Sequence, residues 1–302
     1  MKFLIFGGTG FVGRALIQYL KDQGEDVVHV SRSGKNDSIA LDITNEKDFL
    51  NLDVIPDVIV NCASVTPKKG RTSKDPEFLR ELFSTNVIGA VNICNWAIKK
   101  EVPKVINCST LVVVRKPWPI PLKEEHQNPP TGYHVGYAMS KLGQEQLMNE
   151  CFEGSSSQLI HLRLSAVYGP GMSAEGIIFD TLKKLERNED VNLKDSRKNS
   201  IDLIHVRDVS RVIYSISKGP LKDKILNVAK GEELLIWDLV HLLKKLKQSD
   251  SKILNSDSNL SASPSAIDIS RLEKYLGREF TKFTPYEDGL KEIIDFEKKN
   301  NF

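Results

Sequence analysis

The sequence lacks several features that would mark a specialised protein. Only four of its 302 residues are cysteine, and they form no CxxC pair and no metal-ligand spacing. Aromatic residues make up 7% of the chain, and no apolar run approaches the roughly 18 to 20 residues needed to cross a bilayer. An excess of one charge is also missing, since 42 Lys and Arg stand against 40 Asp and Glu. These absences argue against a disulfide scaffold, a metal site, a transmembrane protein and a strongly basic nucleic-acid-binding protein.

The composition that remains is that of an ordinary globular protein. Hydrophobic residues make up 40% of the chain and charged residues 27%. Met1-Lys2-Phe3 leads directly into a strand-like segment instead of a signal peptide. We therefore expect a cytoplasmic protein with reduced, buried cysteines, no metal, and neither a nucleic acid nor a membrane as its partner.

Short β-branched runs alternate with amphipathic helical patterns over the first 165 residues. The predicted strands are 3–6, 27–30, 58–60, 105–107 and 159–162, and the clearest predicted helices are 11–22, 76–99 and 134–151. Near-continuous apolar strands are buried on both faces, as strands of a parallel sheet are. The alternation predicts an α/β fold, a doubly wound parallel sheet.

Beyond residue 165 the pattern loosens and predicts a smaller second domain of α/β type. We expect helices at 176–188, about 207–218 and 234–247, and strands at 201–206 and 224–229. Residues 1–165 form the first domain, to which the segment near 201–228 returns, and 166–302 mainly form the second. The segment 249–270 holds eight serines, which predicts a surface loop.

A glycine-rich turn follows the first predicted strand. Gly7, Gly10 and Gly13 come between this strand and a helix, as in a Rossmann dinucleotide site. There, backbone N–H groups at the helix start bind the pyrophosphate. The alternative is a flexible loop, but strand, spacing and helix agree. The predicted turn residues are Gly7, Thr9, Gly10, Phe11, Val12 and Gly13.

The end of the second predicted strand favours NADP over NAD. A site for NAD places an acidic side chain there, whereas this chain has Ser31, Arg32 and Ser33. Arg32 and the two hydroxyls could hold a 2′-phosphate, and the alternative is a solvated arginine. Asp42 and Ile43 follow the next short strand and are expected beside the adenine.

Tyr137 and Lys141 are four residues apart at the start of a long predicted helix. This spacing places both on one helical face, where a fixed positive charge lowers the pKa of a phenol. An isolated pair of this kind is often only a solvated helix pair. Here Ser109 and Thr110 also end a predicted strand, where a substrate carbonyl needs a second hydrogen-bond donor.

With these pieces the chain resembles the extended short-chain dehydrogenase/reductase superfamily, in its branch of nucleotide-sugar epimerases, dehydratases and reductases. The resemblance covers nearly the whole chain. It is carried by GGTGFVG at 7–13, LDIT at 41–44, NCAS at 61–64, NVIGAVN at 86–92, CST at 108–110, YAMSK at 137–141, LRLSAVYGPG at 162–171 and LIHVRDV at 203–209.

The resemblance implies roles for particular residues. Thr110, Tyr137 and Lys141 would be the catalytic set, with Ser109 as a possible substitute for Thr110, and Tyr137 and Lys141 would also contact the cofactor. Asn86 would have a structural or water-holding role beside it. Other cofactor contacts would come from Asn61, Cys62, Ala63, Ser64 and the segment from Leu164 to Val167. A homodimer through the helices at 76–99 and 134–151 is also implied.

Departures from the branch narrow the expected reaction. Leu111 and Val112 follow Thr110, where related 4,6-dehydratases carry an Asp-Glu pair and fucose-synthase-like enzymes a cysteine, so dehydration and C3/C5 epimerisation are disfavoured. Ala166 and Ile201 replace residues that contact the sugar-nucleotide diphosphate in relatives. Possible replacement cations are Lys68, Lys69, Arg71, Arg197, Lys198 and Arg207.

These observations favour an NADP-dependent oxidoreductase that reduces a keto group on a nucleotide-activated sugar of the 4-keto-6-deoxyhexose type. One alternative is a nucleotide-sugar 4-epimerase that recycles its cofactor. A second is a nucleotide-sensing module without enzymatic activity, which would have no reason to keep Thr110, Tyr137 and Lys141 together.

Overall fold

A computed structural model describes residues 1–67, 69–132 and 134–300. Lys68, one of the candidate cations, lies outside the described residues. The chain divides into two compact units, the first comprising Met1–Arg115, Gln127–Leu164 and Val209–Val228, and the second Lys116–His126, Ser165–Asp208 and Ala229–Phe302.

The first unit is built on a seven-stranded parallel sheet, as the sequence predicts. In sheet order its strands are β11 (Ile225–Val228), β6 (Gln158–Leu164), β5 (Lys104–Thr110), β4 (Val58–Asn61), β1 (Lys2–Phe6), β2 (Asp26–Ser31) and β3 (Ile39–Ala40). Phe3 to Phe6 of β1 are completely buried, because helices cover both faces of the central strands. The strand order reverses between β1 and β4, and such a switch point opens a crevice at the carboxyl ends of the strands.

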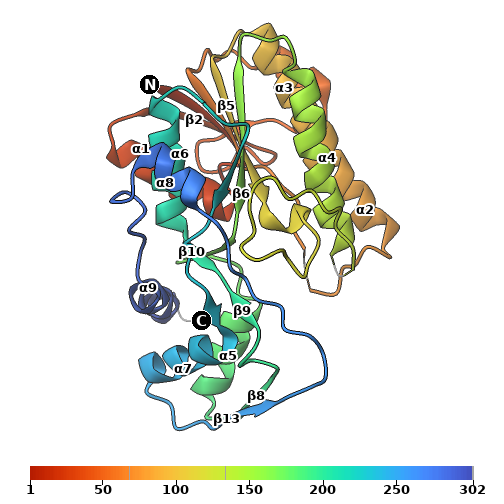
Figure 1. The fold of residues 1–302 in the computed structure, drawn as a ribbon. Coiled ribbons are helices and arrows are strands. Elements are labelled where there is room, and N and C mark those ends of the chain that lie inside the picture. Colours follow the sequence, from red (N-terminus) through yellow and green to blue (C-terminus); the bar gives the residue numbers. More distant parts are fainter. Residues whose placement is uncertain (68, 133, 301–302) are drawn as a thin grey trace. The chain divides into compact units, whose positions relative to one another are not determined.

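Helices lie on both faces of this sheet. Figure 1 shows α2, α3 and α4 on one face and α1 and α6 on the other. The predicted helix 76–99 is one helical segment that contains a π-helical turn, η2. The bounds are α1 (Phe11–Asp22), η1 (Glu46–Asn51), α2 (Pro76–Phe83), η2 (Ser84–Ile88), α3 (Gly89–Lys99), η3 (Leu111–Val113), α4 (Val135–Cys151) and α6 (Val206–Lys218).

Over its described residues, the second unit combines three two-stranded sheets with four helices. β7 (Ala166–Tyr168) pairs with β10 (Leu203–His205), β9 (Ser200–Ile201) with β12 (Leu234–Leu235), and β8 (Val191–Lys194) with β13 (Ile253–Ser256). The helices are α5 (Ile177–Glu186), α7 (Ile236–Lys247), α8 (Ser270–Leu276) and α9 (Tyr286–Lys299). Its core is formed by apolar side chains of α5, α7 and α9, among them Leu182, Leu243 and Ile293.

The structure corrects two predictions for the second unit. The strand expected at 201–206 is divided between β9 and β10, because the chain changes its pairing partner at Asp202, from β12 to β7. There the carboxylate of Asp202 accepts hydrogen bonds from the backbone N–H groups of Lys230 and Gly231. The segment 249–270, expected to be a loop, contains β13, which pairs in parallel with β8.

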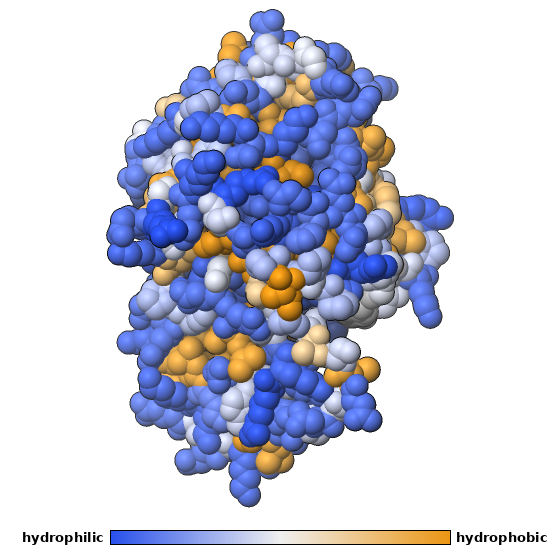
Figure 2. Space-filling model, viewed as in Figure 1, coloured by the Kyte–Doolittle hydropathy of each residue, from blue (hydrophilic) through white to orange (hydrophobic). Residues whose placement is uncertain are grey.

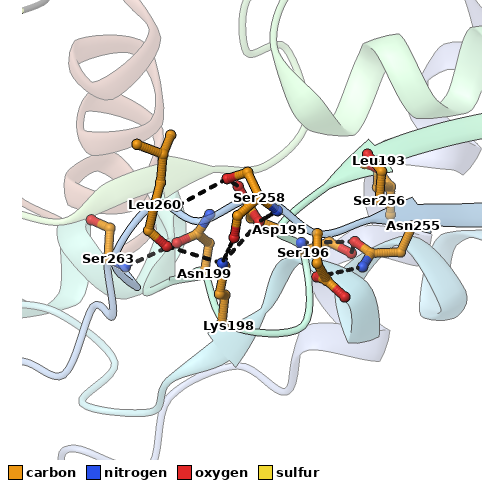
Figure 3. Close-up of polar contacts among 11 residues, drawn as sticks. Leu193, Asp195, Ser196, Lys198, Asn199, Asn255, Ser256, Ser258, Leu260 and Ser263 are labelled. Carbon is orange, nitrogen blue, oxygen red and sulfur yellow. Dashed lines mark hydrogen bonds and ion pairs between the residues drawn. The ribbon is translucent and has the colours of Figure 1, made fainter.

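Polar contacts hold the rest of that serine-rich segment in place (Figure 3). Asp195, at a positive φ of 54°, accepts hydrogen bonds from the backbone N–H and the hydroxyl of Ser258 at 2.6 and 2.5 Å. Lys198 donates to the carbonyl oxygens of Ser258 and Leu260. The hydrogen bonds from Ser258 are the main cause that lowers the pKa of Asp195 to about 2.

One face of the molecule is mainly polar. The face in Figure 2 is largely hydrophilic, with apolar side chains in separate patches. Among the described residues, none of the helices combines the length and the apolar character that a bilayer crossing requires.

Candidate active site

The glycine-rich turn between β1 and α1 leaves room that a side chain would fill. Gly7 has a φ of +77°, and a Cβ there would lie 2.6 Å from the backbone nitrogen of Ala63. A Cβ at Gly13 would lie 2.3 Å from the carbonyl oxygen of Gly7, so α1 can approach β1 only without a side chain at this position. No side chain of the described residues caps α1, and its first turn holds no acidic residue. Its N-terminal N–H groups therefore suit an anion such as a pyrophosphate.

A pocket opens beside this turn at the carboxyl ends of β1, β2 and β4. Its lining includes ten of the residues expected to contact the cofactor: Gly7, Thr9, Gly10, Ser31, Arg32, Asp42, Ile43, Cys62, Ala63 and Ser64. It also includes four residues that sequence reasoning missed, Val30, Leu41, Val65 and Thr85. The lining, the glycine cradle and the uncapped helix together fit a dinucleotide.

The remaining expected cofactor residues lie outside this lining. Phe11, Val12 and Gly13 belong to the first turn of α1. Tyr137 and Lys141 lie on α4, Leu164 ends β6 in the first unit, and Val167 lies on β7 in the second.

Asn86 does not line the pocket, but it hydrogen-bonds to residues that do. Its Oδ1 accepts hydrogen bonds from the backbone N–H of Val65 and the hydroxyl of Ser64, and its Nδ2 donates to the carbonyl oxygen of Val65 and to Ser140. These contacts give Asn86 the structural role, because they position two residues of the pocket wall.

At the end of β2 the hydroxyls are not equivalent. Ser38 donates to the carbonyl oxygen of Lys35 at 2.7 Å, so in its 2.6 Å contact with Ser31 it must accept the proton of Ser31. Ser31 therefore has no proton left for a phosphate. Arg32 is exposed and lines the pocket. Ser33 accepts a long contact from the N–H of Lys35, and its hydroxyl lies 3.5 Å from that of Ser31, to which it can only donate.

Thr110, Tyr137 and Lys141 come together at the carboxyl end of β5. Thr110 ends β5 and hydrogen-bonds with the phenol of Tyr137, which lies in the first turn of α4. One turn later, the Lys141 ammonium donates to the carbonyl oxygen of Cys108 at 2.7 Å. The spacing on α4 thus brings the phenol and the ammonium to the same strand end.

The electrostatics of Tyr137 differ from the prediction. Burial raises the pKa of Tyr137 to about 12, because the phenolate is disfavoured away from water, and the hydrogen bond with Thr110 opposes this shift. The expected lowering by Lys141 is therefore not the dominant effect. Lys141 is itself buried, and its pKa falls to about 8 for the same reason.

Ser109 is not available as a substitute for Thr110. It is 4% exposed, and its hydroxyl donates to the Glu145 carboxylate at 2.5 Å. Glu145 also forms a buried ion pair with Arg163 at 2.8 Å. Successive residues of β5 thus have different partners, since Ser109 contacts Glu145 whereas Thr110 contacts the phenol of Tyr137.

Several candidate cations are already engaged within their own unit. Arg71 forms ion pairs with Asp75 and Glu81, and Arg207 with Glu292. In the second unit Lys198 pairs with Asp195, and Arg197 lies over the ring of Trp237. Within the described residues, no group of three or more His, Cys, Asp and Glu side chains could hold a metal ion. All four cysteines are free thiols.

Comparison with known proteins identifies the class of protein. The model of the NAD dependent epimerase/dehydratase family matches residues 3–229, so the chain belongs to this family. It is therefore an enzyme of the extended short-chain dehydrogenase/reductase superfamily, and the family binds a nicotinamide dinucleotide.

Individual relatives are distant but cover the full length. A putative UDP-glucose 4-epimerase of Methanocaldococcus jannaschii is 23% identical and covers 99% of both chains. The dTDP-4-dehydro-6-deoxyglucose reductase of Escherichia coli is 22% identical and covers 96% of both. The crystal structure of UDP-glucose 4-epimerase from Thermotoga maritima, with UDP-glucose, is 21% identical, covers 100% of both chains and has a TM-score of 0.81, which establishes the shared fold.

Proposed function

We propose that this protein is an NADP-dependent reductase of a keto group on a nucleotide-activated sugar, of the 4-keto-6-deoxyhexose type. The observation that carries the proposal is the end of β2, where Arg32 lines the pocket and no acidic residue follows the strand. A carboxylate at this position would repel a 2′-phosphate, whereas a guanidinium attracts it. Net reduction would draw on the NADPH pool. We further propose that the enzyme is cytoplasmic.

The residues around Thr110 support a reduction without further acid–base steps. Leu111 and Val113 are buried apolar side chains, and Val112 is apolar as well, so η3 supplies no acid or base for elimination or epimerisation at carbon. When bound, the nicotinamide supplies the hydride. Tyr137 would donate a proton to the carbonyl oxygen, Thr110 would orient that oxygen, and Lys141 would hold the ribose.

The same three residues could also serve a 4-epimerase, and one of the similar solved structures is an epimerase. Cofactor consumption separates the two activities. A reductase consumes NADPH in proportion to product, whereas an epimerase returns the hydride to its substrate. We also propose that the enzyme is a homodimer, through the helical segment 76–99, which comprises α2, η2 and α3, and through α4.

The test combines a binding screen with a turnover assay. Nucleotide-sugars, including dTDP-4-dehydro-6-deoxyglucose, are screened by thermal shift in the presence of NADP, since a ligand that binds the folded state raises the melting temperature. The best binders are then incubated with NADPH while absorbance is followed at about 340 nm, where reduced nicotinamide absorbs. Turnover that continues without loss of this absorbance would assign the protein to the epimerases.

A further inference from the structure

The Lys141 ammonium is hydrogen-bonded to a buried glutamine, Gln144. Besides its bond to the carbonyl oxygen of Cys108, the ammonium donates to Oε1 of Gln144 at 2.5 Å. Lys141 is 2% exposed and Gln144 is 1% exposed, so water does not compete for this contact. Both side chains lie on α4, three residues apart and on the side that faces β5.

Neighbouring groups fix the orientation of the Gln144 amide. Its Nε2 donates to the carbonyl oxygen of Asn86 at 2.6 Å, and its Oε1 also accepts from Nδ2 of Asn107 at 3.1 Å. Asn107 is oriented in turn, because its Oδ1 accepts from Asn61 and its Nδ2 lies 3.0 Å from Nδ1 of His161. Rotating the Gln144 amide would place an NH₂ group against the ammonium and a carbonyl against a carbonyl.

The charged and titratable groups around Lys141 come from four elements. Tyr137 and Glu145 share α4 with it, Cys108 lies on β5, Cys62 follows β4, and His161 and Arg163 lie on β6. The Glu145 carboxylate is already bound by Arg163 and by Ser109. Burial keeps His161 neutral near pH 7, because it lowers the pKa of His161 to about 4. The ammonium is therefore held by neutral oxygens, those of Cys108 and Gln144.

We propose that Gln144 is a positioning residue for Lys141, one that holds the ammonium at the carboxyl end of β5 without neutralising its charge. The inference rests on the proposed function, in which Lys141 binds the ribose. A neutral amide oxygen satisfies one N–H of the ammonium while its positive charge stays available. A carboxylate at position 144 would form an ion pair and raise the pKa of Lys141, whereas an apolar side chain would leave the ammonium with one acceptor fewer.

The experiment measures NADPH affinity against pH by fluorescence titration, so it needs no sugar substrate. Affinity should fall as Lys141 loses its proton, with a midpoint near pH 8 in the unaltered protein. In Gln144→Glu the midpoint should rise by about one pH unit or more, and in Gln144→Met it should fall by about as much. Gln146→Glu, the same chemical change on the exposed side of α4, should leave it in place. Melting temperatures identify variants that fail to fold.

Two further results separate this inference from the proposed function. Lys141→Met should abolish the pH dependence altogether. If Lys141→Met kept the midpoint, the role of Lys141 in binding the cofactor would be wrong, and the inference with it. If Lys141→Met abolished the dependence while folded Gln144→Glu and Gln144→Met both kept the original midpoint, only the role of Gln144 would be overturned. Because the two Gln144 variants are expected to shift in opposite directions, a general loss of stability cannot imitate the result.

Discussion

At the scale of single residues, Tyr137 is suited to donate a proton. Burial raises its pKa to about 12, so the phenol stays protonated throughout the neutral range. In a reduction, negative charge develops on the carbonyl oxygen, and an acid within about 2.6 to 3.2 Å must neutralise it. The phenol contacts Thr110, which ends β5, so it lies at the strand end where the proposed mechanism places the carbonyl.

Replacing Tyr137 by Phe should therefore lower kcat by about a hundredfold or more, with NADPH affinity nearly unchanged. Lys141→Met should lower both, since Lys141 is expected to bind the ribose. Steady-state kinetics and cofactor titration measure the two effects. Tyr19→Phe is a matched control, because this tyrosine of α1 packs against Tyr214 away from the pocket lining. Near-normal turnover of Tyr137→Phe would refute the assignment.

Arg32 should determine the choice of cofactor. It is exposed, so solvent and salt weaken its contact with a 2′-phosphate, and we use the lower part of the range for a charged hydrogen bond, about 1.5 kcal/mol. Arg32→Ala should weaken NADPH binding about tenfold and leave NADH binding unchanged. Fluorescence titration of both cofactors measures this, with Lys47→Ala, an exposed cation of η1, as control. Equal affinity of the unaltered protein for NADPH and NADH would end the NADP proposal.

Functional residues can be predicted from the sequence when they belong to a short local motif. Gly7, Gly13 and the pair Tyr137 and Lys141 belong to such motifs. The structure places the glycines in the turn after β1, and the phenol and ammonium at the carboxyl end of β5. Gln144 was missed because the groups that orient its amide toward Lys141, those of Asn86 and Asn107, lie far away in the sequence. The sequence also does not show that the Ser31 hydroxyl donates its proton to Ser38. This hydrogen bond depends on how the chain turns back after β2.

At the scale of elements, a buried ion pair fixes the helix that carries Tyr137. Arg163 of β6 binds the Glu145 carboxylate of α4 through Nη2 at 2.8 Å and Nε at 3.1 Å, and both side chains are almost completely buried. Ser109 of β5 donates to the same carboxylate. Because two strands hold one point of α4, the pair sets how the face with Tyr137 and Lys141 lies against β5.

Removing one partner of the Arg163–Glu145 ion pair should strongly destabilise the folded protein. Arg163→Met leaves the Glu145 carboxylate buried without its cation, so we expect a loss of about 3 to 5 kcal/mol in the free energy of unfolding. Urea denaturation followed by circular dichroism measures the loss. Arg187→Met, which breaks the exposed pair with Glu189, should change stability by less than about 1 kcal/mol. A similarly small effect for Arg163→Met would mean that the buried pair does not hold α4.

Elements with a strong apolar pattern are predicted well, and those held by polar contacts are not. The predicted helix 11–22 coincides with α1, and β1 follows its apolar run, because burial against the sheet requires that pattern. By contrast, β13 lies in a serine-rich segment and pairs with β8, about 60 residues earlier. Ser258, which follows β13, is hydrogen-bonded to Asp195 and Lys198. A periodic pattern in the local sequence does not predict contacts of this kind.

At the scale of the whole molecule, one helical surface of the first unit carries exposed apolar side chains. Phe83 and Ile88 lie on α2 and η2, and Met139 and Leu147 on α4, each between 40% and 52% exposed. Both α2 and η2 pack beside α4. A second copy placing the same surface against it would bury these side chains in a four-helix interface with twofold symmetry.

The unaltered protein should accordingly have twice the chain mass of 33.9 kDa in solution. Replacing Ile88 and Leu147 together by Glu should give a monomer, because each charge would otherwise be buried against the partner copy without a counterion. Light scattering after size-exclusion chromatography measures the mass. Leu50→Glu is the matched control, since Leu50 is 83% exposed on η1, away from this surface, and should leave the dimer intact. A monomeric unaltered protein at micromolar concentration, or a double variant that remains a dimer, would show that the helices α2 and α4 do not form the interface.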